Sequence, residues 1–140
     1  MDMRRKHRFV NKTNKQPIVH VLEHKIHVQI ADYLNMVIKR PSRWHTVEVS
    51  NQQAGRSGMF KQIALKRKGV VTGWPDIEIF LHDKTSNSYK IIFLEVKTSE
   101  GTLTDRQETL HAELREDGYI VHVVRSFEDV EKILQGLEVI

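Results

Sequence analysis

The chain reads GWPDIEIFLHDKTSNSYKIIFLEVK from Gly73 to Lys97, and two apolar segments in this stretch are separated by a polar one. Apolar residues alternate with others over residues 76–82, which predicts a strand. A more continuously apolar run over residues 90–96 predicts a second strand. The polar residues 83–88 between them predict a hairpin turn. Because a strand that is apolar on both faces is usually central in its sheet, we expect residues 90–96 to be buried.

Two acids and a lysine stand at one end of this hairpin. Side chains alternate along a strand, so Glu95 and Lys97 are predicted to share one face while Val96 points into the core. Asp76 begins the neighbouring strand and can lie beside them. Two carboxylates on neighbouring strands form an oxygen-rich site of the kind that holds Mg²⁺ or Mn²⁺, and an adjacent ammonium can face phosphate oxygens. We therefore predict a metal site here.

Each of these residues also has a purely structural interpretation. Asp76 after Pro75 can simply begin a turn. Glu95 and Lys97 can form an exposed ion pair, but such a pair adds little stability and does not explain an acid at the end of so apolar a strand. A buried ionised acid needs a partner or a metal, so the metal site is the favoured interpretation.

The segments before the hairpin predict a helix and a strand. Apolar residues recur at helical spacing over residues 18–37, and Pro41 ends the pattern, which predicts a long first helix. Residues 44–50 are typical of a strand. Residues 59–68 fit either a short helix or an irregular basic segment, and the sequence leaves both open.

The segments after the hairpin predict helix, strand and helix. Thr104 with Gln107 three residues later predicts a capping box, and Gly118 follows the last turn of that helix. Residues 119–124 are typical of a strand, and Ser126 is the expected N-cap of a last helix that ends near Gly136.

The predicted order is therefore helix, three strands, helix, strand, helix, an α/β fold with a mixed sheet flanked by helices. With 140 residues the chain fits one domain, which we place at residues 18–140 after a basic, flexible arm over residues 1–17.

Composition excludes several classes of protein. The absence of cysteine excludes disulfide frameworks, zinc knuckles and thiol nucleophiles. No apolar run approaches the roughly 20 residues that span a bilayer. We expect a cytoplasmic protein, in a bacterial cell or a virus-infected host cell, with no membrane partner and no small-molecule organic cofactor.

Charge is divided unevenly along the chain. Residues 1–73 carry a net charge of +11 and residues 74–140 a net charge of −7, which together give the formal +4. The basic half is suited to track a phosphate backbone, and a solvated, passive tail is the alternative. Candidate nucleic-acid contacts are the cations of two basic clusters, Arg4, Arg5, Lys6, Arg8, Lys66, Arg67 and Lys68.

Two further features have mainly structural interpretations. His20, His24 and His27 have a spacing that suits a transition-metal site on one helix, but no dense His or Cys cluster elsewhere completes it, so a polar helix face is favoured. Trp74 beside the acidic turn suits stacking on a base, yet packing over the end of the sheet is commoner.

These motifs together resemble a known family. Gly73-Trp-Pro-Asp76, Glu95-Val-Lys97, Gly101-Thr-Leu-Thr-Asp-Arg-Gln107 and the strand that follows Gly118 are similar to the VRR-NUC family of PD-(D/E)XK nucleases. The similarity spans roughly residues 19–130. Their order on adjoining strands, with a glutamine on the next helix, is far more specific than any one motif.

The resemblance implies a role for each matching residue. Asp76 and Glu95 would bind the metal, with the backbone carbonyl of Val96 as a further ligand. Lys97 would orient or deprotonate the attacking water, or stabilise the transition state. Gln107 matches the family's helix glutamine, although the capping box explains it equally well. Glu23 corresponds to the family's N-terminal acid, but His27 stands where the family often has glutamine.

The resemblance also implies a restriction-endonuclease-like core and a Mg²⁺- or Mn²⁺-dependent DNA endonuclease. Small stand-alone members resemble dimeric junction-resolving nucleases, so a homodimer acting on branched DNA in replication, recombination or repair is the expected function. The alternatives are a nonspecific or flap-directed nuclease, and a catalytically idle DNA-binding module of the same fold.

Overall fold

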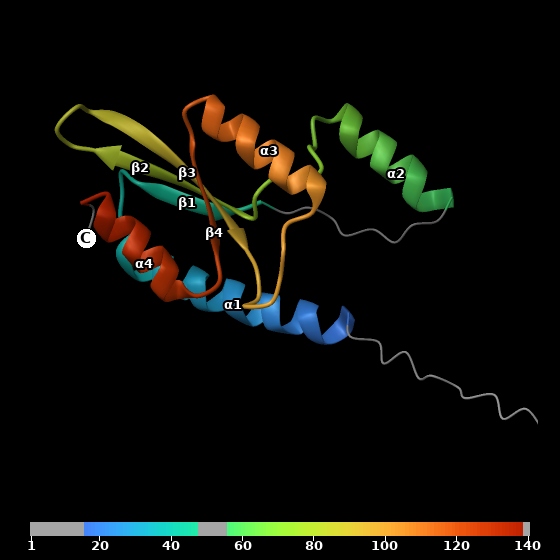
Figure 1. Ribbon diagram of the computed structural model, residues 1–140. Helices are drawn as coiled ribbons and strands as arrows, with labels where there is room; N and C mark the ends of the chain where they lie inside the picture. The colour runs from blue at the N-terminus through green and yellow to red at the C-terminus, as the bar shows by residue number, and fades with distance from the viewer. Residues whose placement is uncertain (1–15, 48–55, 139–140) are drawn as a thin grey trace, which may run out of the picture.

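The computed structural model describes residues 16–47 and 56–138. Four helices and four strands follow one another in these segments (Figure 1). In chain order they are α1 (Gln16–Val37), β1 (Arg43–Thr46), α2 (Arg56–Arg67), β2 (Ile77–Asp83), β3 (Ser88–Val96), α3 (Asp105–Glu116), β4 (Ile120–Val124) and α4 (Phe127–Gly136). No helix in these segments is long and apolar enough to cross a membrane.

The strands form one mixed sheet in the order β1-β2-β3-β4. β1 pairs with β2, and β2 with β3, in antiparallel orientation, whereas β4 pairs with β3 in parallel. A parallel neighbour requires a crossover connection, and α3 supplies it between β3 and β4. The prediction that residues 90–96 form a central strand is confirmed, and the strand is buried from Ile92 to Val96, whereas Lys90 is exposed.

One face of the sheet is aliphatic. Side chains of β2 and β3 on this face pack against α1 and α4, which lie together on one side of the sheet in Figure 1. Period-two alternation places Ile77, Ile79, Ile92 and Leu94 here, and each has no exposed surface. Removal of this apolar surface from water is the main contribution of α1 and α4 to stability.

The opposite face is covered by α3 and is partly polar. A small cluster holds Phe93, Leu110, Leu114 and Val121. Further along the same face, toward the carboxyl end of β3, apolar residues give way to acids. The acidic end of this face therefore lies under the first half of α3.

Capping explains where the later helices begin and end. Thr104 and Gln107 form the predicted capping box at the start of α3, and the Ser126 side chain accepts a hydrogen bond from the Asp129 N–H at the start of α4. Gly118, at φ 93°, ends α3: its N–H donates to the Arg115 carbonyl and the following Tyr119 N–H donates to the Leu114 carbonyl.

Some predicted elements and boundaries differ from the structure. The segment left open between a helix and an irregular run is helix α2, which adds a helix between β1 and β2 to the predicted order. α1 begins at Gln16 rather than residue 18, with Pro17 in its first turn, where its missing N–H leaves no intrahelical bond unmade. β1 ends at Thr46, and the predicted continuation over residues 48–50 lies outside the described residues.

Candidate active site

The backbone brings Asp76 and Glu95 to one end of the sheet. Ile77 pairs with Leu94 in the antiparallel ladder, so the next residues outward, Asp76 and Glu95, face each other across two strands. The Asp76 carboxylate is fixed there because its Oδ2 accepts a 2.8 Å hydrogen bond from the Val96 N–H. The sequence prediction that these two acids lie side by side is consistent with this geometry.

Glu95 is a buried acid with only partial compensation. Its side chain is 2% exposed. Oε1 accepts a 2.7 Å hydrogen bond from Gln107 Nε2 and lies 3.3 Å from Lys97 Nζ. Oε2 has no hydrogen-bond partner among the described residues. An unsatisfied buried carboxylate oxygen is unfavourable, so one acceptor position at this site is left for another group.

Lys97 lies close to acids from both sides of the sheet. The residue follows β3 directly, and its Nζ lies 3.3 Å from Glu95 Oε1 and 3.7 Å from Glu23 Oε1 on α1. All three side chains are at most one quarter exposed. The structure therefore brings Glu23 to the predicted site, and the ammonium of Lys97 stands between two of its acids.

Gln107 uses both ends of its side-chain amide. Its Oε1 accepts a 3.0 Å hydrogen bond from the Thr104 N–H, which completes the capping box. Its Nε2 donates to Glu95 Oε1. The sequence left capping and site interpretations of Gln107 equally plausible, and the structure shows both contacts at once.

The surroundings of Glu95 raise its pKa from an ordinary 4.5 to about 7. Burial is the main cause, the neighbouring charge of Asp76 adds to it, and Lys97 partly opposes both. Glu23 contributes a smaller increase. The site thus holds more negative charge than Lys97 alone neutralises, which is the condition that favours binding of an additional cation.

His111 is a site neighbour that the sequence did not indicate. Its side chain has no exposed surface, and its Nε2 lies 3.8 Å from Glu95 Oε2. Burial, with the nearby cations Arg115 and Lys97, lowers its pKa, which favours the neutral imidazole. A signal did exist: Gln107, Leu110, His111 and Leu114 recur at i, i+3, i+4 and i+7, which is the spacing of one helix face.

Two tight connections hold the site residues in place. Gly73 has φ 83°, a conformation that favours glycine, and a Cβ there would lie 3.1 Å from Arg106 Cγ. On the other side, Arg125 Nη1 donates to the carbonyls of Thr98 and, at 2.7 Å, Gly101. Asp76 and Lys97 therefore each adjoin a constrained segment.

Polar groups continue beyond the site along β2. Glu78 Oε1 accepts a 2.8 Å hydrogen bond from Trp74 Nε1, and its Oε2 lies 2.7 Å from His45 Nε2 on β1. The Trp74 ring contacts Phe93 edge-on, with ring centroids 5.4 Å apart. Trp74 therefore packs over the sheet, the commoner of its two predicted arrangements.

The donor set suits a hard divalent cation. The two acids and the Val96 carbonyl are oxygen ligands of the kind that Mg²⁺ and Mn²⁺ prefer. Within residues 16–47 and 56–138, no three His, Cys, Asp or Glu side chains are gathered as a ready metal cluster. The unpaired Glu95 Oε2 and the excess negative charge nevertheless fit a cation bound by two acids and oxygen atoms of the backbone or water.

Comparison with known proteins identifies the family. The VRR-NUC domain profile matches residues 22–128. The chain belongs to the VRR-NUC family. It therefore has a nuclease-type fold, and the match contains every site residue named above on α1, β2, β3 and α3.

Solved VRR-NUC structures share this fold at low sequence identity. A VRR-NUC domain protein is 18% identical, with a TM-score of 0.59 over 82% of this chain and 86% of that one. A VRR-NUC domain is 17% identical, with a TM-score of 0.52 over 81% of this chain and 95% of that one. A search of proteins with curated functions found no match.

The remaining predicted contacts of this VRR-NUC chain are the cations of the two basic clusters. Arg4, Arg5, Lys6 and Arg8 fall outside the described residues. Lys66, Arg67 and Lys68 lie at the end of α2 and just beyond it, all exposed. The family's frequent glutamine is replaced by His27, whose Nε2 lies 3.0 Å from Thr46 Oγ1 on β1. His20 and His24 are exposed on α1.

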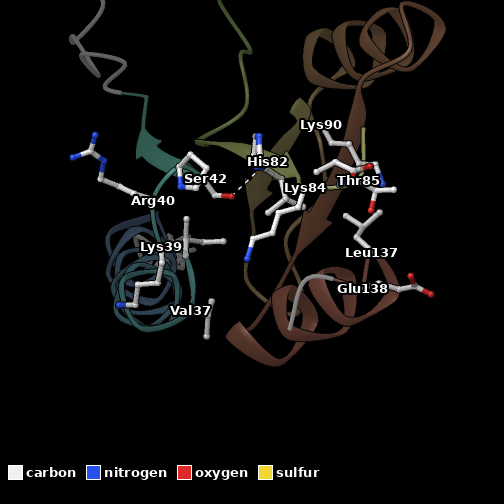
Figure 2. Close-up of a pocket in the computed structure, with 14 residues that line it drawn as sticks. Val37, Lys39, Arg40, Ser42, His82, Lys84, Thr85, Lys90, Leu137 and Glu138 are labelled. Atoms are coloured by element: carbon white, nitrogen blue, oxygen red, sulfur yellow. Dashed lines mark hydrogen bonds between the residues drawn. The ribbon is translucent and has the colours of Figure 1, made fainter. Parts of the chain in front are cut away.

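A pocket of about 480 Å³ lies at the opposite end of the sheet from the acids. Figure 2 shows Lys39, Arg40 and Ser42 on one side of it and Lys84 and Lys90 from the β2–β3 hairpin on the other. The His82 N–H donates to Ser42 Oγ across it. None of the predicted site residues lines this pocket, so it is separate from the candidate active site of the VRR-NUC fold.

Proposed function

We propose that this chain is a Mg²⁺- or Mn²⁺-dependent endonuclease that hydrolyses phosphodiester bonds in DNA. The observation that carries the proposal is Glu95, a buried acid with one unpaired oxygen, beside Asp76 and within 3.3 Å of Lys97. A purely structural ion pair would not require a second acid that raises the pKa of the first.

The residues have distinct roles in this proposal. Asp76 and Glu95 hold the cation, with the Val96 carbonyl and Glu23 as further oxygen ligands. When bound, the cation lowers the pKa of a water molecule and neutralises charge on the phosphate. Lys97 supplies a fixed positive charge beside the attacked phosphate, and its contacts with Glu95 and Glu23 orient it.

Gln107 and the basic segments support this arrangement. Gln107 holds Glu95 Oε1 so that Oε2 stays available to the cation. The basic cations of the first half of the chain attract the phosphate backbone. The finer proposal is a homodimer that cuts four-way junctions, and its support is the resemblance to small stand-alone members of the family.

A cleavage assay tests the proposal. Labelled four-way junctions, flaps, duplexes and single strands are incubated with Mg²⁺, Mn²⁺ or EDTA. We expect cutting with either metal and none in EDTA, and a loss of at least about 100-fold in Asp76→Ala and Lys97→Ala. Glu108→Ala and Lys132→Ala remove exposed charges of the same sign and serve as controls.

The products decide between the alternatives. Paired nicks across the junction by a dimer, whose mass is measured by light scattering, support a junction-resolving enzyme. Preference for flaps, or none, supports a flap-directed or nonspecific nuclease. No cutting of any substrate would leave the chain as a DNA-binding module. Cutting that is unchanged in Asp76→Ala and Lys97→Ala would also contradict the enzyme proposal, because the activity would not come from this site.

A further inference from the structure

Helix α2 carries an exposed stripe of apolar and cationic side chains. Met59, Phe60 and Ile63 are 66%, 74% and 53% exposed. Lys66 and Arg67 are also exposed. Residues three, four and seven apart lie on the same side of a helix, so these five side chains form one surface, which we name the α2 stripe.

The charge of α2 is of one sign. Its sequence, RSGMFKQIALKR, contains four cations and no acid, and Lys68 follows directly. Such a helix is complementary to a polyanion, and it offers that polyanion an aromatic face as well as positive charges.

The stripe is connected to the acids by a short, anchored segment. Gly69, at φ 87°, ends α2 with the hydrogen bonds of a glycine cap. The Thr72 carbonyl accepts a 3.2 Å hydrogen bond from Arg106 Nε, in the turn of α3 that carries Gln107. Arg67 and Asp76 are separated by at most roughly 30 Å of extended chain. In Figure 1, α2 stands beyond the N-terminal end of α3, apart from the sheet.

We infer that the α2 stripe binds unpaired bases of the DNA substrate. Phe60 stacks on a base, Met59 and Ile63 contact its neighbours, and Lys66 and Arg67 bind the adjoining phosphates. The inference rests on the proposed DNA nuclease and names its substrate class: DNA with a single-stranded or splayed segment. In a paired duplex the base faces are covered by their neighbours, so a stacking side chain recognises unpaired DNA.

Binding measurements in EDTA test this without cleavage. The probes are a short labelled single strand and the duplex of the same sequence. Stacking of an aromatic side chain on a base typically changes affinity about 5- to 150-fold. We expect Phe60→Ala to weaken single-strand binding within this range and duplex binding by less than about twofold. Phe60→Trp should keep the affinity, and its fluorescence should be quenched by the single strand.

Two exposed residues outside α2 provide matched controls. Tyr89, in the β2–β3 hairpin, is 53% exposed, and Met36, on α1, is 68% exposed. Tyr89→Ala and Met36→Ala remove comparable exposed apolar surface and should leave both affinities unchanged. If Phe60→Ala weakened single-strand and duplex binding equally, or if Tyr89→Ala matched its effect, the inference would be wrong.

Other occupants of the stripe give different results. Basic amphipathic helices also bind membranes, so binding is measured to vesicles of phosphatidylcholine with phosphatidylserine. Vesicle binding that is lost in Phe60→Ala, with single-strand affinity unchanged, would assign the stripe to a membrane. A dimer that dissociates in Phe60→Ala, again with unchanged single-strand affinity, would assign it to a second copy of the chain.

Cleavage in Mg²⁺ separates this inference from the proposed function. If wild type and Phe60→Ala cut DNA equally and bind single strands equally, the nuclease stands and the base contact is wrong. If wild type cuts no DNA while Phe60→Ala still loses single-strand affinity, the binding surface stands and the nuclease proposal fails.

Discussion

The two faces of the sheet are built from the same strands but differ in what they bury. The face under α1 and α4 buries only aliphatic side chains from β2 and β3. The face under α3 begins with an apolar cluster and ends with Glu95 and His111, both without full hydrogen bonding. One strand contributes side chains to both faces, because successive residues along a strand point to opposite sides of the sheet.

This difference separates stability from chemistry. Close-packed aliphatic contacts stabilise the fold but offer no group that binds a cation or phosphate. Buried ionised acids lower stability unless a positive charge lies beside them, so they favour the binding of a cation. We therefore expect substitutions on the two faces to have opposite effects on stability.

Removing bulk from the aliphatic face should destabilise the protein most. Ile79 has no exposed surface, so Ile79→Ala should lower the free energy of unfolding by about 2–5 kcal/mol. Urea unfolding measures this. Ile63→Ala makes the same chemical change at an exposed position and should alter stability by less than about 0.5 kcal/mol. Equal effects of the two substitutions would contradict the assignment of the core.

Neutralising Glu95 should stabilise the protein in the absence of metal. The pKa of Glu95 is 4.5 ordinarily and about 7 in the fold, so the folded state binds this proton more tightly and wild-type stability falls as pH rises from 4.5 to 7. In EDTA above pH 7, Glu95→Gln should gain on the order of 3 kcal/mol over wild type, and below pH 4.5 the gain should vanish.

Unfolding at several pH values checks the Glu95 prediction. Glu100→Gln changes an exposed acid close in sequence and should show no comparable pH dependence. A Glu95→Gln protein that is less stable than wild type at pH 8 would mean that the charge of Glu95 is well compensated without a metal.

A divalent cation should reduce this difference. Mg²⁺ at about ten times its dissociation constant should stabilise wild type by about 1.4 kcal/mol through selective binding to the folded state. Thermal unfolding with Mg²⁺ or EDTA at matched ionic strength measures the shift. Asp76→Ala and Glu95→Gln should not respond, and an equal response in all three proteins would exclude these acids as ligands.

The two helix caps give the smallest and most closely matched test. Thr104→Ala and Ser126→Ala each remove an N-cap and should lower stability by about 1 kcal/mol. Only the first cap contains Gln107, so only Thr104→Ala should also reduce DNA cleavage, by about 10-fold or more. Equal activity of the two variants would show that the cap does not position the site.

Much of the fold was predictable because its patterns are local. The alternation over residues 76–82 and 90–96 with the polar turn between them predicts the β2–β3 hairpin, and the caps at Thr104 and Ser126 predict two helix starts. α2 was left open because its apolar stripe faces away from the core, so burial did not impose the usual pattern.

The sequence predicts the relative positions of site residues that are close together in the chain. It predicts less well the contacts between residues of different helices and strands. Glu95 and Lys97 are fixed by their spacing on one strand. The burial of His111 depends on which side of α3 meets the sheet, and Arg125 reaches back to Thr98 from beyond β4. The helix-face spacing around His111 does not say which face meets the sheet, and the Arg125 contact has no local signature. The ligand and DNA-contact roles of these residues remain predictions.

The double use of Gln107 restricts which amino acid can stand there. A capping box accepts glutamate as readily as glutamine, because only an acceptor is needed. Beside Glu95, glutamate would bring a second negative charge where a donor is required. Glutamine and glutamate have nearly identical shapes, so only the amide group makes glutamine suitable at position 107. The same amide fixes the rotation of the α3 N-terminus relative to the carboxylate at the end of β3.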